Sequence, residues 1–119
     1  MKKEVKLYAI FLGVNGSVLL TEMTSAEKWQ KISQILRTNR TERFDVEKRF
    51  DGVECVCVAN AYARPDRGYL NTVASHMCGG DVFGNVLVMK RNPIGDSCLM
   101  PLGKARKMKE AIENEFFYA

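Results

Sequence analysis

Three turn signals divide this chain of 119 residues into pairs of strands. Asn15-Gly16 favours a type I′ hairpin turn, which needs positive φ at both central residues, and Asp51-Gly52 is a second hairpin signal. The run Asn92-Pro93-Ile94-Gly95 indicates a third turn. The segments beside these turns are rich in β-branched and aromatic residues, so the turns predict three antiparallel hairpins.

The expected strands cover residues 4–13, 17–22, 43–50, 53–61, 81–90 and 97–100. Segment 53–61 is apolar on both faces over its centre, which predicts an inner strand. Gly84 lies inside the expected strand 81–90 and indicates a bulge or a close approach of the backbone.

A capping box marks the first helix, with Thr24 as the N-cap and Glu27 three residues later. We expect this helix to end near Asn39, because asparagine tolerates the left-handed C-cap conformation. Apolar residues recur on one face of the helix at helical spacing. These residues are Trp29, Ile32, Ile35 and Leu36.

Two more helices are predicted after the second hairpin signal. Residues 69–78 form a short helix that Gly79-Gly80 stops. The last helix runs from residue 104 to about residue 117 and buries an apolar stripe. The stripe consists of Ala105, Met108, Ala111, Ile112 and Phe116.

The order strand-strand-helix, repeated three times, predicts an α+β fold. We expect one mostly antiparallel sheet of hairpins, with two or three helices packed on one face. The length suits a single domain over residues 1–119, large enough for a core without metal or disulfide support.

Composition narrows the class of protein further. With 46% hydrophobic and 27% charged residues, the chain is an ordinary globular one, and it has no apolar run long enough to cross a membrane. The N-terminal segment has no small-residue cleavage site, so we expect mature, cytoplasmic protein without a membrane partner. The net charge of +4 is spread evenly, without the strong imbalance of a dedicated nucleic-acid binder.

The cysteines and the single histidine, His76, offer little chemistry. The four cysteines contain no C-x-x-C pair, so we expect no metal site, no cofactor and four reduced, mostly buried thiols. Ser75 and Cys78 are badly placed on a helix to pair with His76. An enzyme would need His76, Asp81 and Cys78 to converge in one pocket, and we expect no catalytic residue.

The last helix has its charges reversed. Bases fill its first turns and acids its later turns, whereas the helix dipole favours the opposite order. A cation cluster above free backbone N–H groups resembles an anion site, which we assign to Gly103, Lys104, Arg106 and Lys107. The alternative is a solvated face in which Arg106 pairs with Glu110 and Lys109 with Glu113.

A second basic surface is expected around Arg37, Arg40 and Arg43, which are spaced by threes. Together with Lys109 and the aromatic residues Tyr62, Tyr69 and Phe83, these side chains suit a nucleic-acid or partner surface. The alternative is that the arginines are solvated or paired with neighbouring acids such as Glu42.

Asn71, Ala74 and Ser75, followed by segment 82–88, resemble an uncharacterised small domain family common in phages, plasmids and bacterial mobile elements. The match covers residues 70–102, and Gly84-Asn85 stands where that family usually has Gly-Asp. The resemblance implies an accessory protein of a phage or mobile element, in an anti-defence role.

The resulting hypothesis is a non-enzymatic protein that binds a host protein or a small anionic ligand. The alternative is a nucleic-acid-binding accessory protein that uses the basic loop and helix surface. An exposed hairpin edge would also allow a homodimer.

Overall fold

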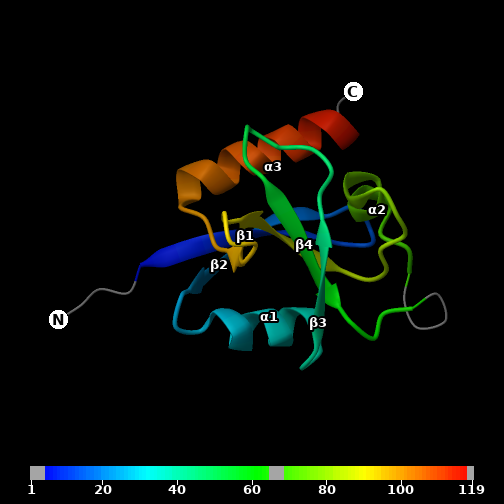
Figure 1. The fold of residues 1–119 in the computed structure, drawn as a ribbon, viewed down its shortest axis with the longest axis horizontal. Helices are drawn as coiled ribbons and strands as arrows, with labels where there is room; N and C mark the ends of the chain where they lie inside the picture. The colour runs from blue at the N-terminus through cyan, green and yellow to red at the C-terminus, as the bar shows by residue number, and fades with distance from the viewer. Residues whose placement is uncertain (1–4, 65–68, 118–119) are drawn as a thin grey trace.

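One antiparallel sheet runs through the computed structural model of this protein, with helices on both of its faces (Figure 1). The structure describes residues 5–64 and 69–117. The elements in chain order are β1 (Lys6–Leu12), β2 (Val18–Thr24), α1 (Lys28–Leu36), β3 (Thr41–Asp45), β4 (Cys55–Asn60), α2 (Thr72–Cys78), β5 (Val86–Arg91), β6 (Ser97–Cys98) and α3 (Leu102–Phe116).

The strand order is β2-β1-β5-β4-β3, and β6 pairs with the end of β5. Every named strand pair in the described residues is antiparallel, which confirms the α+β class and the antiparallel sheet. β4 lies between β5 and β3, and its residues from Cys55 to Ala59 are buried, so the predicted inner strand is confirmed.

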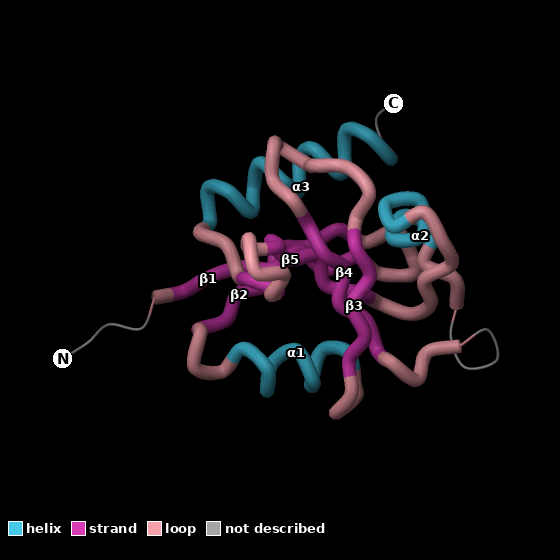
Figure 2. The backbone as a smooth tube through the Cα atoms, in the orientation of Figure 1, coloured by secondary structure: helices cyan, strands magenta, loops and turns pink. Residues whose placement is uncertain are grey.

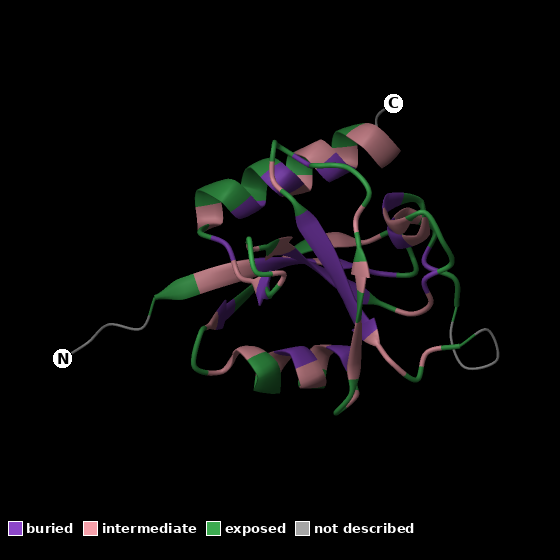
Figure 3. Cartoon of the chain, in the orientation of Figure 1, coloured by how far each residue is buried: buried purple, intermediate pink, exposed green. Residues whose placement is uncertain are grey.

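The helices cover both faces of the sheet, so the expectation of a single helical layer is wrong (Figure 2). Ile32 and Leu36 of α1 pack with Val56 and Leu87 on one face. Residues of α2 and α3 pack on the other face with Cys55, Cys57, Val86 and Val88. The physical reason is that β4 and β5 are apolar on both sides, and each side needs a cover (Figure 3).

The first two turn signals both make hairpins but with different geometry. Asp51 and Gly52 have φ of 52° and 71°, the pair of positive values that a type I′ turn requires. At Asn15-Gly16 the type I′ prediction is wrong, because only Gly16 has a positive φ and its N–H donates to the Gly13 carbonyl. The Asn15 Oδ1 accepts from the Ser17 backbone N–H at 3.1 Å, which stabilises a three-residue loop instead.

The capping-box hydrogen bonds form, but Thr24 as the N-cap is wrong, because Thr24 ends β2 and Glu27 is the N-cap of α1. The Glu27 carboxylate accepts from the Thr24 backbone N–H at 3.0 Å, and the Thr24 hydroxyl accepts from the Glu27 N–H at 3.4 Å. The helix ends at Leu36 with Arg37 as its left-handed C-cap, so the predicted end near Asn39 is wrong. Trp29 is 52% exposed and does not belong to the buried stripe.

Asn71 begins α2 and fixes the loop that follows it. Its side-chain oxygen accepts from the Ala74 N–H, and its amide donates to the carbonyls of Leu12 and Gly84. Gly79 ends α2 with φ of 72°, as the Gly-Gly signal predicted. Residues 79–85 form a loop, so β5 begins later than expected, at Val86.

Candidate ligand-binding cleft

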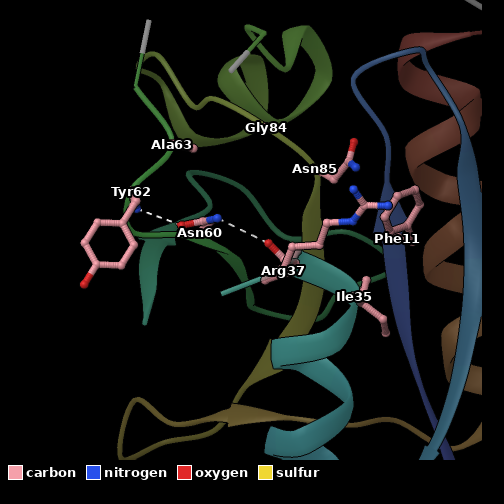
Figure 4. A pocket seen from close by; sticks show the side chains of 9 residues that line it. Phe11, Ile35, Arg37, Asn60, Tyr62, Ala63, Gly84 and Asn85 are labelled. Atoms are coloured by element: carbon pink, nitrogen blue, oxygen red, sulfur yellow. Dashed lines mark hydrogen bonds between the residues drawn. The ribbon is translucent and has the colours of Figure 1, made fainter. Parts of the chain in front are cut away.

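A cavity with a mixed polar and apolar lining lies at one end of the sheet, where the C-terminus of α1 meets β1, β4 and the start of β5 (Figure 4). Its volume is about 610 Å³, within the range of small-molecule sites. We call it the Arg37 cleft, and it is lined by Phe11, Ile35, Leu36, Arg37, Asn60, Tyr62, Ala63, Gly84 and Asn85.

Arg37 is held at the cleft by an uncommon backbone conformation. Its φ is 55° and ψ is 47°, left-handed values that few non-glycine residues adopt, and its N–H donates to the Ser33 carbonyl. The side chain extends from the end of α1 toward Phe11 and Asn85 (Figure 4). Within residues 5–64 and 69–117 its guanidinium makes no ion pair.

Two asparagines at the cleft have their acceptor atoms engaged. The Asn60 Oδ1 accepts from the Tyr62 backbone N–H at 2.8 Å, while its Nδ2 donates to the Leu36 carbonyl at 3.3 Å. The Asn85 Oδ1 accepts from the Val14 backbone N–H at 3.0 Å. The Arg37 guanidinium and the Asn85 Nδ2 can therefore donate hydrogen bonds into the cleft, which suits an acceptor-rich or anionic ligand.

A second depression adjoins the cleft. We call it the Tyr62 hollow; its volume is about 420 Å³ and its lining is Arg40, Thr41, Glu42, Ala61, Tyr62 and Arg64. Tyr62 lines both depressions and is 53% exposed. The Arg64 guanidinium lies 3.8 Å from the Glu42 carboxylate.

The structure brings together only part of the predicted arginine surface. Arg37 and Arg40 line adjoining depressions that share Tyr62. Arg43 instead donates to the Gly95 carbonyl at 2.9 Å and lines a separate hollow. Lys109 lies on α3, on the opposite face of the sheet, 2.9 Å from Glu113 (Figure 2). The prediction that these four residues share one surface is therefore wrong.

The predicted anion site at the start of α3 is exposed (Figure 3). Gly103, Lys104, Arg106 and Lys107 are all exposed and line neither the Arg37 cleft nor the Tyr62 hollow. Pro101 is the N-cap, without a side-chain cap, and no acid lies in the first turn. Anion binding here stays a prediction, and the Lys109–Glu113 pair of its alternative is present.

Of the three residues that the sequence analysis named for an enzyme, only two lie at one cavity. His76 and Asp81 line a shallow cavity of about 240 Å³ with Ser75, but Cys78 does not. The Ser75 hydroxyl is occupied, since it accepts from the Val82 N–H at 2.9 Å and donates to the Val82 carbonyl at 3.3 Å.

Cys78 instead faces Cys57 and the carbonyl of Phe44. The hydrogen bond between the two thiols, together with burial, raises the pKa of Cys57 above its ordinary value. All four cysteines are free; the predicted burial is confirmed for Cys55 and Cys57, while Cys78 and Cys98 are only partly buried. No cluster of three or more histidine, cysteine or acidic side chains suited to a metal occurs in residues 5–64 and 69–117.

Sequence reasoning missed Phe11, Asn60 and Asn85 as site residues. They come from three different strands or strand ends, and only the sheet order places them together. The usable signal was an asparagine at the end of one apolar strand, Asn60, and another just before the next, Asn85.

No helix of the described residues has the length and apolar character to span a bilayer.

No protein-family model matches this chain, and no curated protein matches it. Among solved structures, the crystal structure of small RNA methyltransferase HEN1 is similar, with a TM-score of 0.61 and 14% identity. The match covers 91% of this chain and 16% of that one, so the chain spans about a sixth of that protein's length. What this chain shares with it is the fold.

Proposed function

We propose that this protein is a non-enzymatic binding protein that takes an anionic ligand in the Arg37 cleft. The observation that carries the proposal is the Arg37 guanidinium, which lies in the cleft without an ion-pair partner in the described residues. The neighbouring Asn60 and Asn85 have their acceptor oxygens engaged by backbone N–H groups. A phosphate or carboxylate would receive charge-assisted hydrogen bonds from this site.

The cleft is a better candidate than the start of α3 for a physical reason. Arg37 is exposed, as Lys104 and Lys107 are, but it lines a recess that places amide and apolar side chains around the same space. Lys104 and Lys107 are exposed near the start of α3 and line neither depression, and single ion contacts at such positions contribute little. The recess also offers Phe11 and Ile35 for apolar contact with the rest of a ligand.

Binding of a host protein, an origin in a phage or mobile element, an anti-defence role and a cytoplasmic location stay predictions from the sequence. They are compatible with a cleft that sequesters a small anionic signal. Homodimerisation stays a prediction too, and the two outer strands of the open sheet, β2 and β3, are where a second copy would pair.

The test is a titration of ¹⁵N-labelled protein with inorganic pyrophosphate, followed by NMR. We expect saturable shifts in the Arg37 side-chain resonance and the Asn85 amide, with little change at residues 103–107. Arg37→Gln should abolish these shifts, while the matched pair Lys104→Gln/Lys107→Gln should leave them intact. Shifts confined to residues 103–107, or no saturable shift, would contradict the proposal.

A further inference from the structure

We infer that the anionic ligand is single-stranded nucleic acid, held across the Arg37 cleft and the Tyr62 hollow. This inference rests on the proposed function, because it names the ligand class of the same site. The two depressions share Tyr62, so they form one path over the end of the sheet. A ligand longer than one nucleotide can contact both.

Cations stand on both sides of Tyr62 along this path. Arg37 lies in the cleft, and Arg40 and Arg64 line the hollow. Glu42 is the acid among these lining residues, so three arginines against one glutamate leave a net charge of +2. Spaced positive charges along a groove are what a phosphate backbone requires, since each neutralised phosphate releases condensed counterions.

An exposed aromatic ring separates these cations. The Tyr62 side chain is 53% exposed, and its ring points away from Arg37 toward the outer side of the site (Figure 4). Its backbone is fixed, because its N–H donates to the Asn60 Oδ1 at 2.8 Å. A nucleobase can stack on such a ring without regard to sequence, and stacking on aromatic side chains is the usual contact of single-stranded binding surfaces.

The same geometry disfavours a duplex. The bases of a duplex are already stacked on one another and expose only their edges, so Tyr62 has no base face to contact. A free mononucleotide offers the same chemistry as one unit of the strand, but it brings a single phosphate group to the three arginines. We therefore expect a single strand to bind more tightly than either.

Fluorescence polarisation with a labelled oligouridylate of about 12 nucleotides tests this directly. We expect binding at least about tenfold tighter than to the same strand annealed to oligoadenylate, or to uridine monophosphate in competition. Three phosphate contacts predict that affinity falls about 20-fold between about 50 and 200 mM salt.

Variants of the path locate the binding. Arg37→Gln should weaken binding and reduce the salt slope by about 0.7, the share of one single-strand phosphate contact. Tyr62→Ala should weaken it at least about fivefold, and Tyr62→Phe should restore it, because the ring is what stacks. Glu42→Gln should strengthen binding, since it removes the one acid of the path. A merely structural role of these residues predicts no such gain.

The matched control is Arg43→Gln, an arginine on the same strand as Glu42 that is engaged with the Gly95 carbonyl. We expect its affinity to stay within about twofold of the wild type. Equal loss in Arg43→Gln and Arg37→Gln, or equal affinity for strand and duplex, overturns the inference. If pyrophosphate shifts the Arg37 and Asn85 resonances but no oligonucleotide binds, this inference fails and the proposed function stands. If neither ligand binds, both fail.

Discussion

The two basic regions of this protein differ in how the fold makes them. The Arg37 cleft gathers side chains from α1, β1, β4 and the approach to β5, whereas residues 103–107 are neighbours on one helix. The first region is a recess in which the exposed Arg37 guanidinium has no ion-pair partner among the described residues, and the second is a run of exposed charges along one helix. A cluster of charge in a sequence therefore need not coincide with the place where the fold builds a site.

The cleft depends on a buried amide that stands behind it. Asn71 is 1% exposed, and its Nδ2 donates to the Leu12 carbonyl at 3.1 Å and to the Gly84 carbonyl at 2.9 Å. Its Oδ1 caps α2 through the Ala74 N–H at 3.1 Å. Leu12 follows the cleft residue Phe11, so one side chain ties together α2, β1 and the Gly84 loop.

Asn71→Ala should have the largest effect on stability. It removes a helix cap and leaves two carbonyls without their donor, which together cost about 2–4 kcal/mol of unfolding free energy. Urea denaturation measures the loss. Asn92→Ala is the matched control, because its side chain caps an exposed turn through the Asp96 N–H, and we expect it to cost about 1 kcal/mol or less. Equal losses would show that Asn71 does not hold the cleft.

Gly84→Ala should have the next largest effect on stability, and Gly84 is itself one of the residues that line the cleft. Gly84 has φ of 80°, and an added Cβ would lie 3.4 Å from the Ala63 Cβ. The left-handed backbone alone makes the substitution cost about 1–2 kcal/mol. Gly80→Ala is the control, since Gly80 has open space around its Cβ position and is not among the residues of positive φ. A Gly84→Ala protein as stable as the wild type would contradict this account of the wall.

The core beneath α3 is closely packed, in contrast to the exposed first residues of that helix. The contacts of the Cys55 thiol show this packing. Its Sγ lies 3.7 Å from the Met108 sulfur of α3, and burial raises the pKa of Cys55 from 9.0 to about 11. A raised folded-state pKa stabilises the protein fully below the unfolded-state value near 9.0, and this stabilisation is lost as pH rises toward 11.

Stability should therefore fall above pH 9, by about 1 kcal/mol at about pH 10 from Cys55 alone. Urea titrations at neutral and alkaline pH measure the fall. Cys55→Ala should reduce it by that amount, although its stability at neutral pH is lower, while Cys98→Ala, at a partly exposed thiol, serves as the control. An unchanged alkaline slope in Cys55→Ala would mean that water reaches the thiol under α3.

Local sequence predicted the elements well because their signals are local. The capping box at Thr24, the Gly-Gly stop after Cys78 and the turn at Asp51-Gly52 each depend on residues within one turn of chain. Asn39 failed as a C-cap because the backbone turned earlier, at Arg37, where arginine has no special preference for the left-handed region.

The face that each helix covers and the place of the cleft were beyond local reasoning. Trp29 was assigned to the buried stripe by its spacing, yet it is 52% exposed, and the contact of α1 with the sheet is made by Ile32, Leu36 and the partly buried Ile35. The cleft needs β1 beside β5 and β5 beside β4, a strand order that hairpin signals do not specify. Phe11, Asn60 and Asn85 meet only after that order is set.

Arg37→Gly should separate stability from binding at the cleft. Glycine adopts the left-handed C-cap without strain, so the variant should gain about 0.5 kcal/mol of unfolding free energy after the entropic cost of glycine is subtracted. It should also lose the pyrophosphate response. Arg37→Ala is the control, because it loses the guanidinium but keeps the strained backbone. A Gly variant less stable than the Ala variant would show that the backbone at residue 37 is unstrained.

Lys104→Glu, in the second basic region, should have the smallest effect on stability. Unlike Arg37→Gly, it should leave ligand binding at the cleft intact. An acid in the first turn of α3 interacts favourably with the helix dipole, so the variant should gain about 0.3 kcal/mol, a gain that high salt removes. Ligand binding at the cleft should be unchanged. Lys104→Gln should give part of the gain, since it only removes the unfavourable charge. If Lys104→Glu abolishes pyrophosphate binding while Arg37→Gly does not, the exposed start of α3 is the anion site and the cleft is not.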